Sequence, residues 1–299
     1  MSTNYTKPSA RVYALVVFML LIWGGNYIAA KMVFREIPAN LVICIRTIVA
    51  GIVIIPIYWM EARKRPPVLT WPEIRLLLLL GLGGITTNQV FWTLGIARTT
   101  VIHSSMIMAT TPLWVLLIAT LMGIEKINAA KASGMAIAMT GVVLLQVFRS
   151  QNAGGEATLL GDFFILICAL ALAGMTAYGK RHRPLSGGIA VNAVGYAGGA
   201  LLIGPLLPFL SNGFDFSRVS AKAWLSIAYM GVFSSVVGYL IYYYALARMQ
   251  ASRIATFQYL QPVFASALAV ILLNEHLGVG AIAAGAVIFT GVFVTERFG

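Results

Sequence analysis

The chain has 299 residues, of which 60% are hydrophobic and only 10% are charged, and its formal net charge is +12. An ordinary soluble domain is about 45–50% apolar and about 25% charged, so this composition excludes a soluble globular protein and indicates a membrane protein. The basic residues lie mostly in short connections between apolar runs, which favours a role in membrane orientation over nucleic-acid binding.

The apolar runs predict membrane-spanning helices, because a bilayer core about 30 Å thick needs about 20 apolar residues per helix. The alternating pattern of a membrane β-barrel is missing, so helices are the remaining way to cross a bilayer. The first run is not read as a signal peptide, since no small-x-small cleavage site follows it and nine further runs do. The ten predicted spans are 11–31, 41–59, 74–95, 103–122, 131–147, 160–179, 189–209, 223–246, 252–272 and 278–295.

An even number of spans places both termini on one side of the membrane. If that side is the cytoplasm, most Lys and Arg residues fall there, including the clusters at 63–65 and 180–183. Short cytoplasmic loops are enriched in Lys and Arg, so the sequence predicts cytoplasmic termini.

Polar and aromatic side chains lie inside several spans. For the deeper ones, a contact with a transported molecule and a hydrogen bond between helices are equal alternatives. We take as candidate substrate-binding residues Trp23 and Asn26 in the first span, Asn88 and Trp92 in the third, Tyr178 in the sixth, and Tyr239 and Tyr243 in the eighth.

The fourth and ninth spans each contain a proline, Pro112 and Pro262. A proline inside a helix removes one hydrogen bond and displaces the carbonyl four residues before it. In hydrocarbon, a freed carbonyl is tolerated only where it faces protein or a wet cavity. The sequence therefore predicts a bend at each proline, which we interpret as a hinge, or alternatively two kinked helices that only pack.

Polar side chains share a helical face with each freed carbonyl. They predict a cavity near the middle of the membrane, and the alternative is that the amides bond to neighbouring helices. The candidates on these faces are Met108 and Thr111 in the fourth span, and Gln258 and Gln261 in the ninth.

His103, near the start of the fourth span, is a further candidate. A role in proton relay and an interfacial histidine bonded to a headgroup or loop carbonyl both fit its position. Glu125 and Glu275 close the fourth and ninth spans, where we expect salt bridges or caps to the following helix.

The chain contains an internal repeat. Shifting it by about 150 residues pairs Ala97-Arg98 with Ala247-Arg248, Pro112 with Pro262, and Glu125 with Glu275, while Lys31 pairs with Lys180. A unit of five helices copied in tandem must enter the membrane in the opposite direction, and such inverted repeats enclose the substrate site of many transporters. We therefore predict two inverted five-helix repeats, residues 1–150 and 151–299.

The nine carboxylates lie at or beyond the ends of spans, and Arg46 is the one basic residue within a span. A site without fixed charge suits neutral, zwitterionic or aromatic solutes. Catalytic motifs are missing, and His103, His182 and His276 are too scattered to share a metal ion. We expect no enzyme activity, no metal and no cofactor, whereas a channel remains an alternative to a carrier.

The segment "WGGNYIAAK" in the first span, Arg46 in the second, and the paired pattern of Ala-Arg, proline, glutamate and "TGV" resemble the EamA-type permeases of the drug/metabolite transporter superfamily. The resemblance covers nearly the whole chain. It implies an all-α integral membrane protein with ten transmembrane helices in two inverted five-helix repeats, a central substrate cavity, and export of small metabolites.

Within that superfamily the chain looks most like amino acid exporters of bacterial inner membranes, including exporters of aromatic amino acids. We expect a monomer in the lipid bilayer that moves a small amino acid-like molecule by alternating access and binds no nucleic acid. A multidrug or quaternary-cation exporter and a channel-like facilitator are the alternatives.

Overall fold

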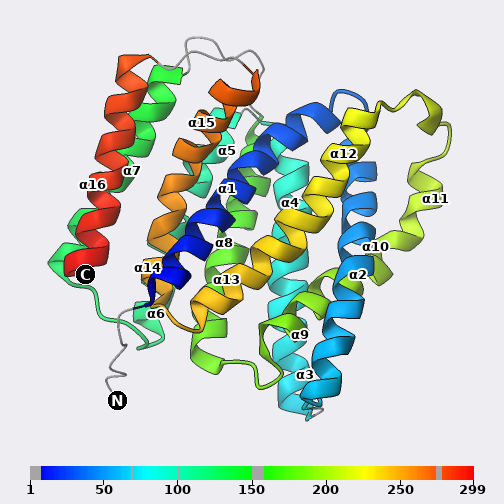
Figure 1. Ribbon diagram of the computed structural model, residues 1–299, viewed down its shortest axis with the longest axis horizontal. Helices are drawn as coiled ribbons and strands as arrows, with labels where there is room; N and C mark the ends of the chain where they lie inside the picture. Colours follow the sequence, from blue (N-terminus) through cyan, green and yellow to red (C-terminus); the bar gives the residue numbers. More distant parts are fainter. Residues whose placement is uncertain (1–7, 69, 100, 150–157, 274–277) are drawn as a thin grey trace.

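The computed structural model describes residues 8–68, 70–99, 101–149, 158–273 and 278–299. These residues form helices joined by turns, with no strand among them. Within the described ranges, nine helices are long and apolar enough to cross a membrane. Figure 1 shows them running between two ends of a single bundle. The all-helical membrane class predicted from composition is therefore confirmed.

The first half of the chain supplies five of the nine candidate spans. Two of these are interrupted helices. The elements are α1 (Ala10–Val33), α2 (Ala39–Lys64), the run of α3 (Trp71–Leu78), π-helical η1 (Leu79–Thr86) and α4 (Thr87–Ile96), the pair α5 (Val101–Met108) and α6 (Thr111–Leu121), and α7 (Ala129–Arg149).

The second half supplies the other four spans. They are α8 (Leu159–His182), the run of α9 (Gly187–Ala193), π-helical η3 (Val194–Gly198), α10 (Gly199–Ile203), η4 (Gly204–Leu206) and α11 (Leu207–Leu210), the run of α12 (Ala221–Tyr229), π-helical η6 (Met230–Val237) and α13 (Gly238–Leu246), and α16 (Val279–Phe298). A short 3-10 turn, η5 (Phe216–Arg218), lies between two of the spans.

The predicted ninth span, 252–272, falls on α14 (Ala251–Phe257), the 3-10 turn η7 (Gln258–Leu260) and α15 (Gln261–Leu273). This stretch is helical, but it is not one of the nine helices of the described ranges that are long and apolar enough to cross a membrane. The structure thus supports nine of the ten predicted membrane helices, and the tenth stays a prediction.

Both prolines that the sequence marked as helix breakers follow a break. The fourth span turns at Ala109 and Thr110, directly before the helix that carries Pro112 at its start. The ninth span tightens into η7 directly before α15, the helix that carries Pro262 as its second residue. Proline has no backbone N–H to donate to the carbonyl four residues before it, so an α-helix is interrupted there. The breaks therefore lie where the sequence predicts them.

Both described ends of the chain lie together. Tyr13, near the start of α1, donates a hydrogen bond to Glu296, near the end of α16, and Arg253 lies 3.5 Å from the same carboxylate. We call this the termini end, at the lower left of Figure 1, and the other the opposite end. Termini on one side agree with the sequence, whereas their cytoplasmic location stays a prediction.

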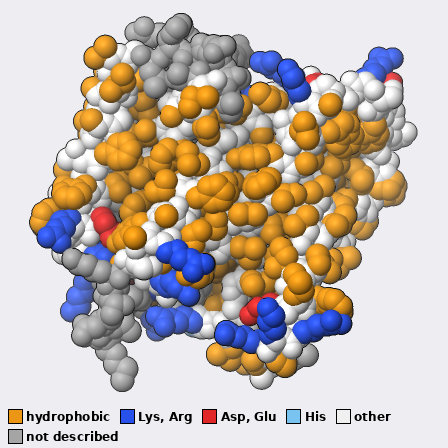
Figure 2. Space-filling model, viewed as in Figure 1, with side chains coloured by type: hydrophobic (Ala, Val, Ile, Leu, Met, Phe, Trp, Pro, Cys, Tyr) orange, Lys and Arg blue, Asp and Glu red, His pale blue; other side chains and the backbone are white. Residues whose placement is uncertain are grey.

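The outside of the bundle is apolar, as a helix facing lipid requires. Ile52 and Leu121, for example, are 65% and 78% exposed. Figure 2 shows hydrophobic side chains covering the middle of one face, with Lys and Arg side chains gathered toward its upper and lower edges. This distribution is the one expected when polar headgroups border a hydrocarbon core.

Small residues allow the closest helix contacts. A Cβ atom added to Gly291 of α16 would lie 2.3 Å from the backbone nitrogen of Ala138 in α7. A Cβ atom on Gly81 of η1 would lie 2.8 Å from the backbone nitrogen of Gly195 in η3. Without a hydrophobic driving force between helices in lipid, such close backbone packing is a main source of association.

Helices α1 and α8 form the centre of the bundle. Helix α1 packs against α12, α13 and α15, and α8 packs against α4, α5 and α6. Figure 1 shows α1 crossing the front of the molecule with α8 behind it. The space between these two groups of helices contains the candidate site.

Candidate functional site

A cavity of about 40 Å³ lies between the first, third, fourth, sixth, eighth and ninth predicted spans. Its walls are aromatic rings and amides with few aliphatic groups. The lining residues are Trp23, Asn26, Tyr27, Asn88, Gln89, Trp92, Met108, Leu172, Ser234, Tyr239, Gln258 and Gln261.

A second cavity of about 30 Å³ adjoins the first, since both are lined by Tyr27, Met108, Gln258 and Gln261. We call the two cavities together the chamber. The further lining residues are Ser105, Ala109, Gln146, Pro262 and Ala265.

The volume of the chamber shows whether a metabolite fits in this conformation. A cavity needs about 10–15 Å³ to hold one water molecule, whereas pockets for small molecules usually measure about 300–1,000 Å³. Each cavity therefore has room for only a few water molecules. In this conformation the walls must separate before a metabolite fits.

Asn88 is the centre of the hydrogen bonds in the chamber wall. Tyr239 Oη donates to Asn88 Oδ1 at 2.7 Å, and Asn88 Nδ2 donates to the carbonyl oxygen of Cys168 at 3.0 Å. These bonds join α13, α4 and α8. Asn88 therefore acts as a link between helices in this conformation, one of the two roles that the sequence left open.

Trp23 closes another part of the wall. Its Nε1 donates to the carbonyl oxygen of Ser234 at 3.1 Å, and its ring meets that of Tyr239 with centroids 5.5 Å apart at 61°. Trp92 meets Tyr27 edge to face at 5.4 Å. Edge-to-face pairs hold rings in defined orientations, so the aromatic walls are ordered surfaces.

Two amides in the chamber have unused polar atoms. Asn26 is 7% exposed and its Oδ1 accepts no hydrogen bond, while Gln258 is 7% exposed and its Nε2 donates none. A buried polar atom without a partner costs about 1–3 kcal/mol. An acceptor and a donor are thus available in one chamber for a solute that carries both complementary groups.

Eight of the twelve candidate binding residues line the chamber, and contact with a substrate stays a prediction for all of them. Those eight are Trp23, Asn26, Asn88, Trp92, Met108, Tyr239, Gln258 and Gln261.

The other four candidates lie elsewhere. His103 is at the opposite end, where its Nδ1 is 2.9 Å from Asp162 Oδ2 and its side chain is 50% exposed. Tyr178 packs on the ring of His182, with centroids 4.1 Å apart, and lines two grooves outside the chamber. Thr111 and Tyr243 are buried but line neither cavity of the chamber.

Several lining residues were not among the candidates. Tyr27 and Gln89 each directly follow a candidate in the sequence, and Gln146 is an amide within an otherwise apolar part of the fifth span. A search for every amide within a predicted span would have found Gln89 and Gln146.

The described residues contain no group of three His, Cys, Asp or Glu side chains that could hold a metal ion. Cys44 and Cys168 are both buried as free thiols.

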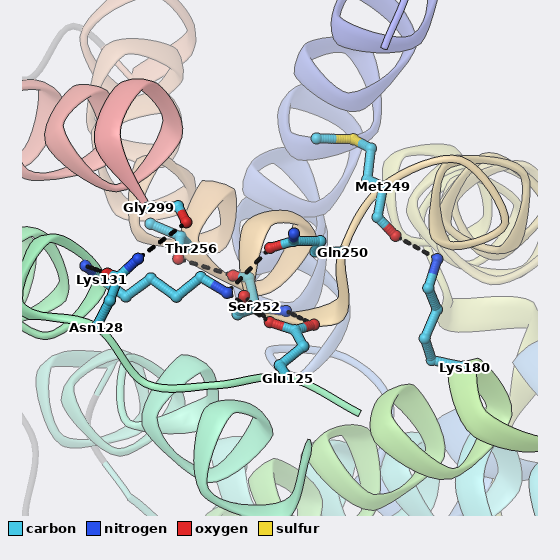
Figure 3. A network of polar contacts seen from close by, with 9 residues as sticks. All are labelled: Glu125, Asn128, Lys131, Lys180, Met249, Gln250, Ser252, Thr256 and Gly299. Atoms are coloured by element: carbon cyan, nitrogen blue, oxygen red, sulfur yellow. Dashed lines mark hydrogen bonds and ion pairs between the residues drawn. The ribbon is translucent and has the colours of Figure 1, made fainter. Parts of the chain in front are cut away.

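Figure 3 shows a network of polar contacts at the termini end, several of them buried. Lys131 Nζ lies 3.0 Å from Glu125 Oε2, and the two side chains are only 4% and 5% exposed. Lys131 also donates to Gln250 Oε1 at 3.0 Å. A buried ion pair is tolerated only when its remaining polar atoms are bonded, and here they are.

Glu125 reaches across the bundle. Its Oε1 accepts from the backbone nitrogen of Ser252 at 3.1 Å, and its Oε2 accepts from the hydroxyl of the same residue. Carboxylates stabilise helix N-termini, because the first backbone amides of a helix have no partner within it. For Glu125 the predicted salt bridge to the following helix is present, and the helix that it caps is α14 of the ninth span. Glu275, for which the same contacts were predicted, lies outside the described residues.

Lys180 of α8 contacts the segment that leads into Gln250, the partner of Lys131. Its Nζ donates to the carbonyl oxygen of Leu246 at 2.6 Å and also to that of Met249. These carbonyls lie at and just beyond the C-terminus of α13, where cations are favourable. We call the contacts of Glu125, Lys131, Lys180 and their partners the termini-end network.

A family model describes the chain along most of its length. The model of the EamA-like transporter family matches residues 10–147 and again residues 159–297. The chain belongs to the EamA-like transporter family. It is a multi-pass membrane protein of a transporter family, as the sequence resemblance implied.

Relatives of this EamA-like transporter have similar lengths. A protein of Archaeoglobus fulgidus named an uncharacterized transporter is 24% identical over 96% of this chain and 98% of its own. An uncharacterized inner membrane transporter of Escherichia coli is 26% identical over 95% and 90%. A protein of Streptantibioticus cattleyicolor named a probable terminal-alkyne amino-acid exporter is 27% identical over 75% and 74%.

One solved crystal structure superimposes on the chain with a TM-score of 0.75, covering 96% of each chain at 18% sequence identity. At that identity the likeness shows the fold alone.

Proposed function

We propose that this EamA-like transporter exports amino acids, including aromatic ones, across a bacterial inner membrane by alternating access through the chamber. The observation that carries this proposal is the pair of buried, unused polar atoms, Asn26 Oδ1 and Gln258 Nε2, between aromatic walls. An amino acid offers the complementary groups. Its ammonium can donate to Asn26, and its carboxylate can accept from Gln258.

The aromatic walls suit the rest of such a solute. The faces of Trp23 and Tyr239 attract an ammonium group through cation–π interaction. The same rings and the thioether of Met108 can pack on an apolar or aromatic side chain. The relative named an amino-acid exporter supports the same class of substrate.

The transport cycle that we propose uses two inverted repeats, residues 1–150 and 151–299. Support comes from the two matches of the family model and from the π-helical segments η1 and η6, which interrupt the third and eighth spans at corresponding positions. In an inverted pair, the same bending motion opens one end while closing the other.

We infer that the termini-end network closes this end of the molecule in the conformation described here. Export with cytoplasmic termini requires this end to open so that a substrate can enter. We infer that the termini-end network breaks in that step and that the ninth and fourth spans bend at the breaks before Pro262 and Pro112.

Transport by the purified monomer in liposomes tests the proposal. A panel of radiolabelled amino acids is offered with and without a pH gradient, and Asn26→Ala and Gln258→Ala are compared with the wild type. Saturable flux of amino acids that both variants impair supports the proposal. If neither substitution changes the flux, or if no amino acid is moved, the proposed function is wrong.

A quaternary-cation exporter is the second candidate, because the aromatic walls of the chamber would also hold a methylated ammonium. Flux of tetraphenylphosphonium or a quaternary ammonium without flux of amino acids would favour it. A channel-like facilitator would show flux that does not saturate over the same concentrations.

A further inference from the structure

Arg46 of α2 is a charged side chain in the interior of the bundle. It is only 1% exposed. In the part of the chain that the structure describes, no ion pair neutralises it. The sequence led us to expect a chamber remote from any fixed charge, and the position of Arg46 corrects that expectation.

Neutral oxygen atoms are its hydrogen-bond partners. Its Nη2 donates to Ser235 Oγ at 3.1 Å and to the carbonyl oxygen of Met230 at 3.5 Å, and its Nη1 donates to Thr93 Oγ1 at 3.4 Å. Its Nε has no partner. The guanidinium is therefore held in place, but its charge is not cancelled.

Burying such a charge inside a membrane protein carries a large desolvation free energy. Ionised groups in membrane spans are rare and usually belong to the path of a solute or ion, because desolvation costs several kcal/mol. The three neutral bonds join α2 to α4 and η6, but a neutral amide could make similar links at lower cost. The retained charge calls for a role of its own.

The chamber lies one layer of side chains away. The guanidinium carbon of Arg46 is 5.8 Å from the centre of the Trp92 ring, and Trp92 lines the chamber. Its partner Thr93 follows Trp92 in α4 and donates to the carbonyl oxygen of Gln89, which also lines the chamber. In such a water-poor region a charge acts over this distance with little screening.

We propose that Arg46 gives the chamber a positive potential that selects solutes with a carboxylate and disfavours solutes with a net positive charge. This inference rests on the proposed function and specifies its substrate class. A zwitterion that donates to Asn26 with its ammonium and accepts from Gln258 with its carboxylate gains from this potential at the carboxylate. A cation without a carboxylate is repelled by Arg46 and has no carboxylate to offset that repulsion, which argues against the quaternary-cation alternative.

The decisive quantity is a ratio of two transport rates. Phenylalanine and phenylalaninamide have the same ring and α-amine, but the amide lacks the carboxylate and is mostly cationic at about pH 6, below the usual α-amine pKa of about 8. Initial rates of both solutes are measured in liposomes for the wild type, Arg46→Gln and Arg46→Lys. Arg218→Gln, at an exposed site, is the control.

We expect the wild type to prefer phenylalanine. The rate for phenylalanine divided by the rate for phenylalaninamide should fall about tenfold in Arg46→Gln, which corresponds to about 1.4 kcal/mol. It should remain near the wild-type value in Arg46→Lys and in the Arg218→Gln control. A merely structural role would lower both rates together and leave the ratio unchanged, and that result overturns the proposal.

Two further outcomes separate a failure of the role of Arg46 from a failure of the proposed function. If Arg46→Gln does not fold, the wild type and Arg46→Lys decide. Equal rates for the two solutes in the wild type overturn the role of Arg46, and a strong preference for phenylalanine in both proteins supports it. If the wild type moves neither solute nor any other amino acid, the proposed function fails, and the role of Arg46 fails with it.

Discussion

The two ends of the molecule use similar polar contacts in different surroundings. At the termini end, the side chains of Lys131 and Glu125 are 4% and 5% exposed. At the opposite end, the side chains of Arg218 and Asp215 are 86% and 52% exposed. Exposed ion pairs contribute about 0–1 kcal/mol, whereas breaking a buried pair costs about 3–5 kcal/mol. The buried pair therefore has the larger part in holding the described conformation.

Two lysines that the sequence repeat pairs show the same difference. Lys180 is buried and caps the end of α13, while Lys31 at the opposite end is exposed. If the repeats exchange roles during transport, Lys31 should take up the matching contacts with the end of α4 when the termini end opens. In the proposed cycle, the buried lysine therefore marks the closed end and the exposed lysine marks the end that closes next.

The largest effect should come from Glu125→Gln. The substitution keeps the shape of the side chain but leaves Lys131 as a buried charge without its counter-ion. We expect a loss of about 3–5 kcal/mol in the free energy of unfolding, measured by thermal or denaturant unfolding in detergent.

The double variant Glu125→Gln/Lys131→Met should recover much of that loss, because both charges are then removed. Arg218→Gln should change the stability by no more than about 1 kcal/mol. Equal effects of Glu125→Gln and Arg218→Gln would mean that the two ends do not differ as described.

Lys180→Met should have the next largest effect. The carbonyl oxygens of Leu246 and Met249 lose the lysine donor in a buried place, which costs about 1–3 kcal/mol. Lys31→Met at the exposed position should stay within about 0.5 kcal/mol. Thermal unfolding of the two variants side by side checks this, and a larger loss from Lys31→Met would contradict the assignment of the closed end.

The sequence predicted what depends on local composition. Apolar runs gave the helical membrane class, and Pro112 and Pro262 marked the breaks in the fourth and ninth spans. About half of the chamber lining, eight of its seventeen residues, could be predicted for the same reason, since polar residues such as Asn88 and Gln258 stand out inside apolar helices.

Partners far apart in the chain could not be predicted. Glu125 was expected to meet the following helix, yet it also bonds to Ser252 and so caps α14, which begins more than a hundred residues later at Ala251. His103 carries a side chain suited to proton transfer, but packing places it beside Asp162 outside the chamber. These pairings depend on how the helices pack together, and a single sequence does not show which helices are neighbours.

Pro262→Ala tests whether the ninth span bends at Pro262 when one end of the molecule opens and the other closes. Alanine permits the helical hydrogen bond that proline lacks, so the ninth span should straighten and the bending step should slow. We expect turnover in liposomes to fall about tenfold, equivalent to about 1.4 kcal/mol in the barrier. Unchanged turnover would show that the bend at Pro262 is not a hinge.

The smallest effect concerns the exposed contacts of the opposite end. The backbone nitrogen and the hydroxyl of Ser220 donate to Glu36 at 2.6 and 2.7 Å, and these bonds hold the pKa of the carboxyl below its usual 4.5. With the folded pKa below the unfolded one, this stabilisation is present above about pH 4.5 and is lost as the pH falls through the folded pKa.

Glu36→Gln removes this titration. The difference in melting temperature between the wild type and Glu36→Gln should be small at neutral pH and should shrink toward zero as the pH falls below about 4.5. A difference that grows on acidification would contradict the assigned hydrogen bonds.

Distances across both ends test the central claim most directly. Spin labels at exposed positions Lys126 and Arg248 span the termini end, and labels at Arg98 and Gly278 span the opposite end. Pulsed EPR is recorded for each pair in wild-type and Glu125→Gln backgrounds. Alternating access predicts that Glu125→Gln lengthens the first distance and shortens the second. Two distances that stay fixed, or that lengthen together, would contradict it.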